Sequence, residues 1–162
     1  MKKLQVLIVG ILLIITFSAP VVIAADTATI TITVTASGTV SISVSPTTWA
    51  MGTLALGTYN ATSSTYFTLS NDGDVRVDTQ INASNSQNWN LVTGTPATDE
   101  FKIDTLGTIA ITLTTSLQNF KQDLDPVTGN TYQFGLNFTM PTADTSGGVE
   151  QTITVTIKAA QG

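Results

Sequence analysis

Apolar and hydroxyl side chains alternate with period two along "ATITITVTASGTVSISVS", residues 28–45. Its even positions are apolar or glycine, and nearly every odd position is threonine or serine. Because successive side chains of a strand point to opposite faces, the pattern predicts a strand with one buried face. One unbroken strand of this length would run roughly 55 Å at about 3.3 Å per residue, whereas strands in compact domains usually span about 17 to 20 Å. We therefore expect either a turn within the segment or a first half that leaves the domain.

Two pairings satisfy this pattern. A hairpin closed by a three-residue loop at 37–39 sets Val34 opposite Ile42, so that both apolar rows face one core. Alternatively, the first half is a donor strand that completes the sheet of a neighbouring subunit. The donor residues are then those of the apolar row, Ala28, Ile30, Ile32 and Val34.

Shorter alternating segments follow along the rest of the chain. They are separated by turn residues and lie at 65–70, 75–83, 89–92, 101–104, 108–114, 132–140 and 151–159. The turn "NDGD" at 71–74 predicts that the first two of these form a hairpin. Several short alternating strands of this kind predict an all-β fold. We expect an antiparallel β-sandwich, immunoglobulin-like or jelly-roll-like, with an extended N-terminal strand.

The N-terminus has the order of a secretory signal peptide. Lys2 and Lys3 precede an apolar run, and small residues follow up to Ala24 and Ala25, where cleavage is expected. The alternative is an uncleaved anchor, because the apolar stretch is close to the about 20 residues that span a bilayer. Pro20 and the small residues favour cleavage. The predicted organisation is a signal peptide at 1–24, an extended strand at 25–38 and a β-sandwich domain at 39–162. We expect a secreted or cell-surface protein without membrane contact after cleavage.

Composition removes several classes of chemistry. The chain has no cysteine and no histidine, which leaves no zinc site, no thiol nucleophile and no imidazole base. Its formal net charge is −5, so we expect no nucleic-acid partner. The remaining acids, such as Asp99 and Glu100, lie together in predicted loops rather than across a cleft. We therefore expect that the protein is not an enzyme.

Calcium is the better chemical candidate, because the acidic turns are rich in oxygen ligands. The candidate residues are Asp72, Asp74, Asp123 and Asp125. Neither turn has the spacing of a complete calcium-binding loop, and aspartate, asparagine and glycine are equally the residues that tight turns require. We favour the interpretation as turns, with no cofactor.

Aromatic residues and glycosylation sequons are the other candidate surface features. A sugar-stacking platform would use Trp49, Trp89, Tyr59, Tyr66 and Tyr132, although tryptophan in a small sandwich is more often a core anchor. The sequons predict N-glycans at Asn60, Asn82 and Asn137. The odd position of Asn137 in its strand turns it away from the apolar row.

A family resemblance covers most of the chain after the signal. The run "SPTTWAMGTLALGTYNATSSTYFTLSNDGDVRVDTQINAS" and the ending "TYQFGLNFTMP" with "QTITVTIKA" resemble the secreted β-sandwich proteins that include TasA, camelysin and the archaeal bundling pilins. The chain shares with them an extended strand after the signal, a glycine-containing segment before an apolar strand, and an Asn-Gly-type turn. This resemblance implies polymerisation by donor-strand exchange. The acidic character common in the bacterial members is weak in this chain.

From the sequence we expect a structural subunit of an extracellular filament, pilus or biofilm matrix. Its partners would be other copies of itself, as a homopolymer, and other components of the matrix or cell surface. The alternative is a monomeric binding module or adhesin that recognises carbohydrate or a surface protein, with residues 28–35 as an ordinary edge strand of its own sheet.

Overall fold

A computed structural model describes residues 30–35, 37–126 and 130–162 of the chain. The predicted signal peptide at 1–24 and the donor residue Ala28 lie outside them. The chain divides into two units, Met1–Thr35 and Ala36–Gly162, and each is described by itself. The secondary structure of the second unit, as far as it is described, consists of strands and turns without a helix.

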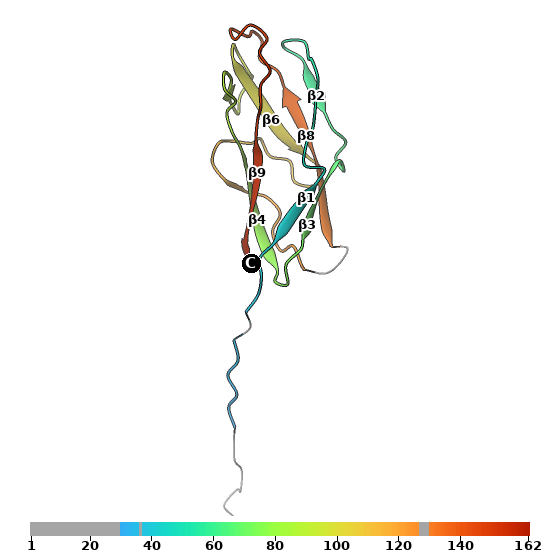
Figure 1. The fold of residues 1–162 in the computed structure, drawn as a ribbon, viewed down its shortest axis with the longest axis vertical. Coiled ribbons are helices and arrows are strands. Elements are labelled where there is room, and N and C mark those ends of the chain that lie inside the picture. Colours follow the sequence, from blue (N-terminus) through green and yellow to red (C-terminus); the bar gives the residue numbers. More distant parts are fainter. Residues whose placement is uncertain (1–29, 36, 127–129) are drawn as a thin grey trace, which may run out of the picture. The chain divides into compact units, whose positions relative to one another are not determined.

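The described residues of the second unit form nine strands in two sheets (Figure 1). The larger sheet has the order β1 (Ile42–Ser45), β3 (Phe67–Asn71), β8 (Thr131–Thr139), β6 (Glu100–Leu106) and β5 (Asn90–Leu91), and β2 (Tyr59–Ala61) also pairs with β8. The smaller sheet has the order β7 (Gln118–Asn119), β4 (Val77–Ala83) and β9 (Val155–Gln161). Neighbouring strands are antiparallel except for β5 and β6. The prediction of an all-β fold with strands in two sheets is confirmed.

The sheets curl toward each other and form a half-barrel that is closed along one side. The segment after β6 crosses between the sheets there: Leu113 N donates to Ile103 O at 2.8 Å, and Ala83 N donates to Thr114 O at 3.0 Å. β7 then pairs with β4. This connection joins the β6 side of the larger sheet to the β7 side of the smaller one. The opposite edges of the two sheets, β1 and β9, therefore lie on the other side of the half-barrel (Figure 1).

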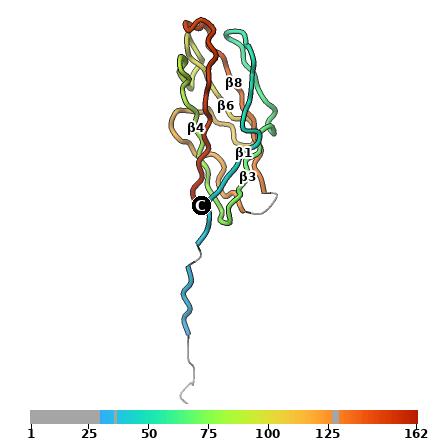
Figure 2. Tube along the Cα trace, in the orientation of Figure 1, coloured from blue at the N-terminus to red at the C-terminus, as the bar shows by residue number. Residues whose placement is uncertain are grey.

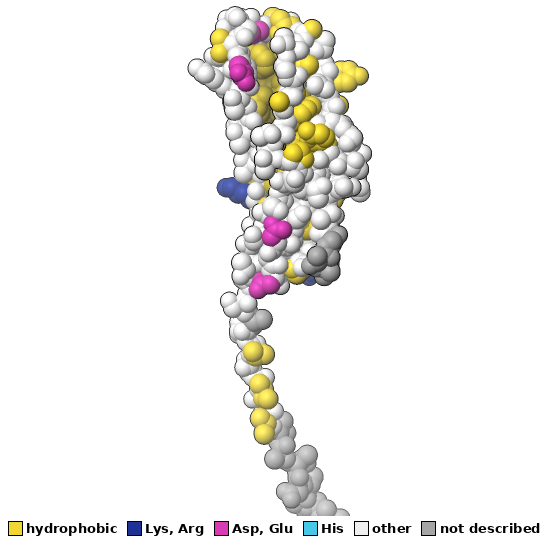
Figure 3. Space-filling view, turned by 45° about the vertical axis from the view of Figure 1, so that its right-hand side comes forward, with side chains coloured by type: hydrophobic (Ala, Val, Ile, Leu, Met, Phe, Trp, Pro, Cys, Tyr) yellow, Lys and Arg dark blue, Asp and Glu magenta, His cyan; other side chains and the backbone are white. Residues whose placement is uncertain are grey.

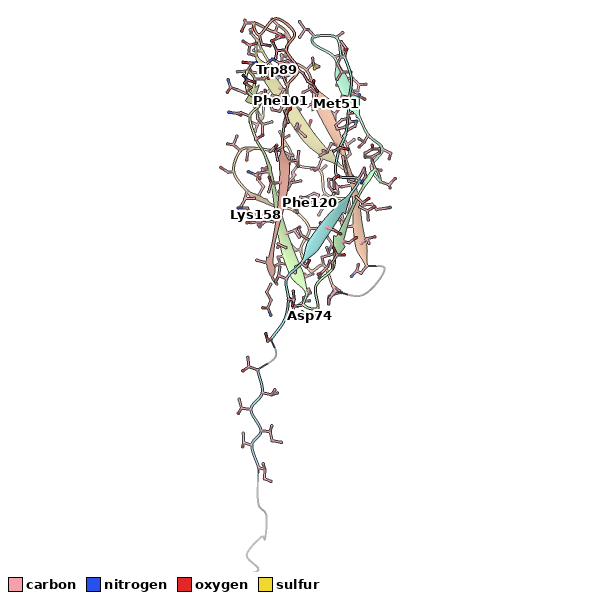
Figure 4. All side chains as sticks on the ribbon, in the orientation of Figure 1. Met51, Asp74, Trp89, Phe101, Phe120 and Lys158 are labelled. Atoms are coloured by element: carbon pink, nitrogen blue, oxygen red, sulfur yellow. The ribbon has the colours of Figure 1, made fainter. Side chains whose placement is uncertain are left out.

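An aromatic core fills the space between the sheets. β8 alternates as its sequence predicts, and Tyr132, Phe134, Leu136 and Phe138 are all buried. Phe134 stacks on Phe67 with ring centroids 5.3 Å apart and meets the edge of Phe120 at 5.1 Å. Figure 4 shows Phe120 and Phe101 at different heights inside the domain. Burying each such side chain contributes about 1.5–3 kcal/mol, so this row is a main source of the domain's stability.

The predicted hairpin between 65–70 and 75–83 is wrong. β3 pairs with β1 and β8, whereas β4 pairs with β7 and β9, so the segment 71–74 connects two sheets. Asn71 anchors the crossing, because its Nδ2 donates to Val75 O at 2.9 Å and to Leu124 O at 2.8 Å. An Asp-Gly turn has the same local sequence whether the flanking strands pair or separate. Here both edges of β3 are taken by other strands, which leaves none for β4.

The alternating segment 108–114 is also not a regular strand. It meets β6 through a single bridge, between Asp104 and Thr112, before it crosses to the other sheet. At its start, Ile109 N donates to the hydroxyl of Tyr132 at 3.0 Å. The alternation reflects side chains that face the core on one side of a crossing segment.

Asn71 provides a test of the crossing. We expect Asn71→Ala to lower the free energy of unfolding by about 2 kcal/mol, because Val75 O loses its side-chain donor and Leu124 O keeps only Val77 N as a donor. Urea unfolding followed by circular dichroism measures this loss. The matched control is Ser70→Ala, on the half-exposed face of the same strand, for which we expect a change within about 0.5 kcal/mol. Equal effects of the two substitutions would contradict the anchoring role of Asn71.

Candidate functional site: the open side between β1 and β9

Two strand edges lack a partner on the open side of the half-barrel. Within the described residues, β1 pairs only with β3 and β9 pairs only with β4. Ile42 at the start of β1 pairs with Asn71, and Gln161 at the end of β9 pairs with Val77. Because 71 and 77 flank the same turn, β1 begins and β9 ends at one end of the domain (Figure 2). The two edge strands therefore run in opposite directions.

The core-facing side chains of these two edge strands are only partly covered. On β4 the inward row Val77, Thr79, Ile81 and Ala83 is buried. The inward residues of β1 and β9, and Ile153 just before β9, are each partly exposed: Ile42, Val44, Ile153, Val155, Ile157 and Ala159. We call these six residues the open side. Figure 3 shows hydrophobic side chains reaching the surface in the upper half of the domain.

The partly exposed apolar side chains and the backbone edges without a partner thus lie on the same two strands, β1 and β9, of the described structure. A single β-strand with one aliphatic row meets both needs, because its backbone pairs with the two edges and its side chains cover the core. Native proteins normally protect such edges, since an exposed edge is a template for pairing with another chain. The site is suited to binding a strand.

The described part of the first unit has the matching pattern. Residues 30–35 belong to no strand, and Ile30, Ile32 and Val34 are 86%, 84% and 86% exposed. The threonines between them would face away from a core. Residues 21–45 contain no proline, so each backbone N–H of the segment can donate to a ladder.

The chain enters the second unit along the 71–74 turn. Thr39 N donates to the Asp74 carboxylate, and Asp74 N donates to Thr39 O at 3.1 Å. Asp72 N donates to Ser41 O at 2.9 Å. A Cβ at Gly38 would lie 1.8 Å from Cγ1 of Val75, so a larger residue there would require that side chain to move. Figure 4 shows Asp74 at the lower end of the domain.

The hairpin alternative stays a prediction, because it pairs residues of the two separate units. Three-residue hairpin loops usually end on a residue in the left-handed region. Neither Gly38 nor Thr39 has a positive φ, and Thr39 makes the two hydrogen bonds with Asp74 described above.

Two of the four calcium candidates make side-chain contacts within the domain. Asp74 accepts from Thr39 N, and Asp123, at φ 55°, forms an ion pair with Arg76 Nη1 at 3.3 Å. Asp72 and Asp125 are exposed. In the part of the chain that the structure describes, no group of three or more acidic, histidine or cysteine residues could hold a metal ion. The interpretation of these acids as turn residues stays a prediction.

The five aromatic candidates do not form one exposed platform. Trp89 and Tyr132 are buried in the core, and Trp49 is partly buried against it. Tyr59 and Tyr66 are 72% and 41% exposed. Only the last two offer an open ring face or edge for a ligand.

The sequons lie on three different strands, with Asn60 on β2, Asn82 on β4 and Asn137 on β8. All three side chains are partly buried, and Asn82 Nδ2 donates to Thr115 O at 2.9 Å. Asn137 faces away from the buried row of β8, and its Oδ1 is buried without a hydrogen-bond partner among the described residues. Glycosylation at these sites stays a prediction.

Asp144 is a structural residue that the sequence analysis missed. Its carboxylate accepts from Trp89 Nε1 at 3.1 Å, Ser146 N at 2.9 Å and Gly148 N at 2.9 Å. The hydrogen bonds from the Ser146 hydroxyl and from Trp89 hold the pKa of Asp144 far below its ordinary value. Aspartate before "TSGG" is the available signal, because the glycines at 147 and 148 allow the loop to fold back on the carboxylate.

Comparisons with models of protein families, with curated proteins and with solved structures found no match to this chain. Among the described residues, no helix is long and apolar enough to cross a membrane.

The loop contact of Asp144 predicts a pH-dependent stability. The pKa is lower in the folded protein than the unfolded value of about 3.9, so the stabilisation is complete above that value and is lost as the pH falls through the folded pKa. We expect Asp144→Asn to lower the melting temperature at pH 7 and the difference from wild type to narrow below about pH 4. Thermal unfolding across this pH range measures the effect.

The matched control is Asp72→Asn, which removes an exposed carboxylate outside any side-chain hydrogen bond of the described structure. We expect no comparable change in melting temperature at any pH. A constant difference between Asp144→Asn and wild type from pH 7 to below pH 3 would contradict the charged hydrogen bonds.

Proposed function

We propose that the protein is a non-enzymatic structural subunit of an extracellular filament, pilus or biofilm matrix. In this proposal, the apolar row of residues 28–35 from one subunit inserts into the open side of another copy. One observation supports it above the others. In its described part, the chain carries both two strand edges without a partner, lined by partly exposed aliphatic side chains, and a separate, highly exposed aliphatic row of strand period.

The inserted strand would also complete the fold. With residues 25–38 as its N-terminal strand, supplied by a neighbour, the half-barrel becomes a closed, mainly antiparallel β-sandwich of immunoglobulin-like or jelly-roll-like form. Cleavage after the signal peptide frees this strand outside the cell. Other matrix or cell-surface components are secondary partners, and N-glycans at the sequons would make the subunit a glycoprotein.

Magnitudes decide which groups must drive assembly. Burying Ile30, Ile32 and Val34 contributes about 5–9 kcal/mol in total. Ordering the backbone of the six residues 30–35 costs about 6–12 kcal/mol, which cancels that gain. The net stability must therefore come from covering the six apolar residues of the open side and from the new backbone ladders. Stable assembly therefore needs both the aliphatic row of the donor segment and the apolar residues of the open side.

Ile32→Asp tests the proposal, because it places a carboxylate in the middle of the aliphatic row that must be buried. We expect this variant to be exported and folded, with the melting temperature of a wild-type monomer, and to form no filaments. Negative-stain electron microscopy of the purified mature protein and thermal unfolding of its monomer measure the two properties.

Two further variants serve as controls. Thr33→Asp puts the same charge on the outward face of the same segment, and we expect it to retain filaments. Ile81→Asp, at a fully buried position of β4, should unfold the domain itself. A wild-type protein that stays monomeric at high concentration, or an Ile32→Asp variant that assembles normally, would overturn the proposal in favour of a monomeric binding module or adhesin.

A further inference from the structure

The direction of the inserted strand determines what kind of assembly forms. Because β1 and β9 run in opposite directions, a strand between them is parallel to one and antiparallel to the other. If the protein assembles by strand insertion, as proposed above, this direction decides whether the assembly is open or closed.

The end of the domain at which the chain enters relates the direction of the donor strand to the symmetry of the assembly. Thr39 pairs with Asp74 at the end where β1 begins and β9 finishes, and Gly162 N donates to Arg76 O at the same end. In a head-to-tail stack, the donor segment leaves one subunit at this end and enters the next from the far end. Its N-terminal residues then lie nearest the end where the acceptor's β9 finishes, so it is antiparallel to β9 and parallel to β1.

The opposite direction produces closed structures. A donor segment that enters at the end where β9 finishes is parallel to β9. This geometry belongs to the hairpin within one chain or to a reciprocal dimer, in which two copies exchange segments about a two-fold axis. Neither of these can grow further, whereas a heterologous head-to-tail contact leaves a free open side at one end.

Side-chain sizes favour the antiparallel direction. With Ile32 opposite Ile157, the antiparallel register sets Val34 opposite Val155 and Ile30 opposite Ala159. In the parallel register with the same central pair, Ile30 lies opposite Val155 and Val34 lies opposite Ala159. In the antiparallel register the summed side-chain volume varies less from pair to pair. A close-packed core accommodates such pairs better than it accommodates a bulky pair at one end and a small pair at the other.

Ladder length favours the same direction. β9 has seven residues in its strand and β1 has four. Antiparallel pairing is slightly more stable per residue than parallel pairing, so the arrangement that makes the longer ladder antiparallel is the better one.

We propose that the donor strand lies antiparallel to β9 and parallel to β1 of the next subunit, with Ile32 opposite Ile157. The polymer is then an open head-to-tail filament with a distinct polarity. One terminal subunit has an empty open side and the other has a free donor strand.

Engineered disulfides test this direction cleanly, because the chain has no cysteine of its own. In the antiparallel register Thr31 lies opposite Lys158, and in the parallel register it lies opposite Thr156. Thr31 and Lys158 are exposed, and Thr156 is partly buried. Neighbouring strands bring Cα atoms within the range that a disulfide needs. The two variants are Thr31→Cys with Lys158→Cys, and Thr31→Cys with Thr156→Cys, with Thr31→Cys alone as the control.

Filaments assembled from each full-length mature variant are oxidised, and the products are separated by non-reducing electrophoresis. We expect a ladder of covalent oligomers from Thr31→Cys with Lys158→Cys, and loss of that ladder in the other pair and in the control. A ladder, a covalent dimer or an internally bridged monomer from Thr31→Cys with Thr156→Cys would overturn the direction.

Filaments that yield no cross-link from either pair would overturn the register and with it this inference. Failure of the proposed function looks different, because wild-type protein would then form no filaments at all. Electron microscopy of the untreated wild type therefore separates the two failures.

Discussion

The need of β1 and β9 for backbone partners is the constraint on which the rest of this structure depends. Every N–H and C=O along a strand must find a partner once water is excluded, and an apolar face must be covered. The closed side of the half-barrel meets both needs within the chain, because the segment after β6 crosses from one sheet to the other. The open side meets neither need among the residues that the structure describes, and its aliphatic side chains stay partly exposed. A molecule with this asymmetry is stable enough to fold around its aromatic core, yet it retains a line along which a further strand lowers its free energy.

The turn at 71–74 connects this constraint to the direction of assembly. It carries the chain from one sheet to the other, and its backbone also holds the incoming residues 38–41. The side-chain amide of Asn71 holds the crossing from inside the domain, because its Nδ2 donates to Val75 O and Leu124 O. As a result, β1 begins at the same end at which β9 finishes. That single turn determines where a donor segment leaves a subunit. It therefore also determines the polarity of a filament built from such subunits.

Side-chain alternation in the sequence predicted the structure correctly where one face of a strand packs against the core. The rows of β8 and β4 and the all-β class follow directly from period two, because burial on one face dictates alternation. The exposed aliphatic row of Ile30, Ile32 and Val34 was equally visible. Pairing partners were not, and the expected hairpin at 71–74 was wrong because an Asp-Gly turn carries no information about whether its flanking strands join one sheet or two. The Asp144 contact with Trp89 was missed for a related reason, since it joins residues 55 positions apart in sequence.

The sequence by itself determined the class of structure, the residues of the core and the presence of an aliphatic row without an evident partner. These are properties of neighbouring residues, set by side-chain alternation and by burial of one face. The tertiary structure decided which edges remain unpaired, which residues line the open side and in which directions its two strands run. Those features depend on contacts between segments distant in sequence, such as Ile42 with Asn71 and Val77 with Gln161, whose hydrogen bonds form between backbones and leave no trace in side-chain pattern.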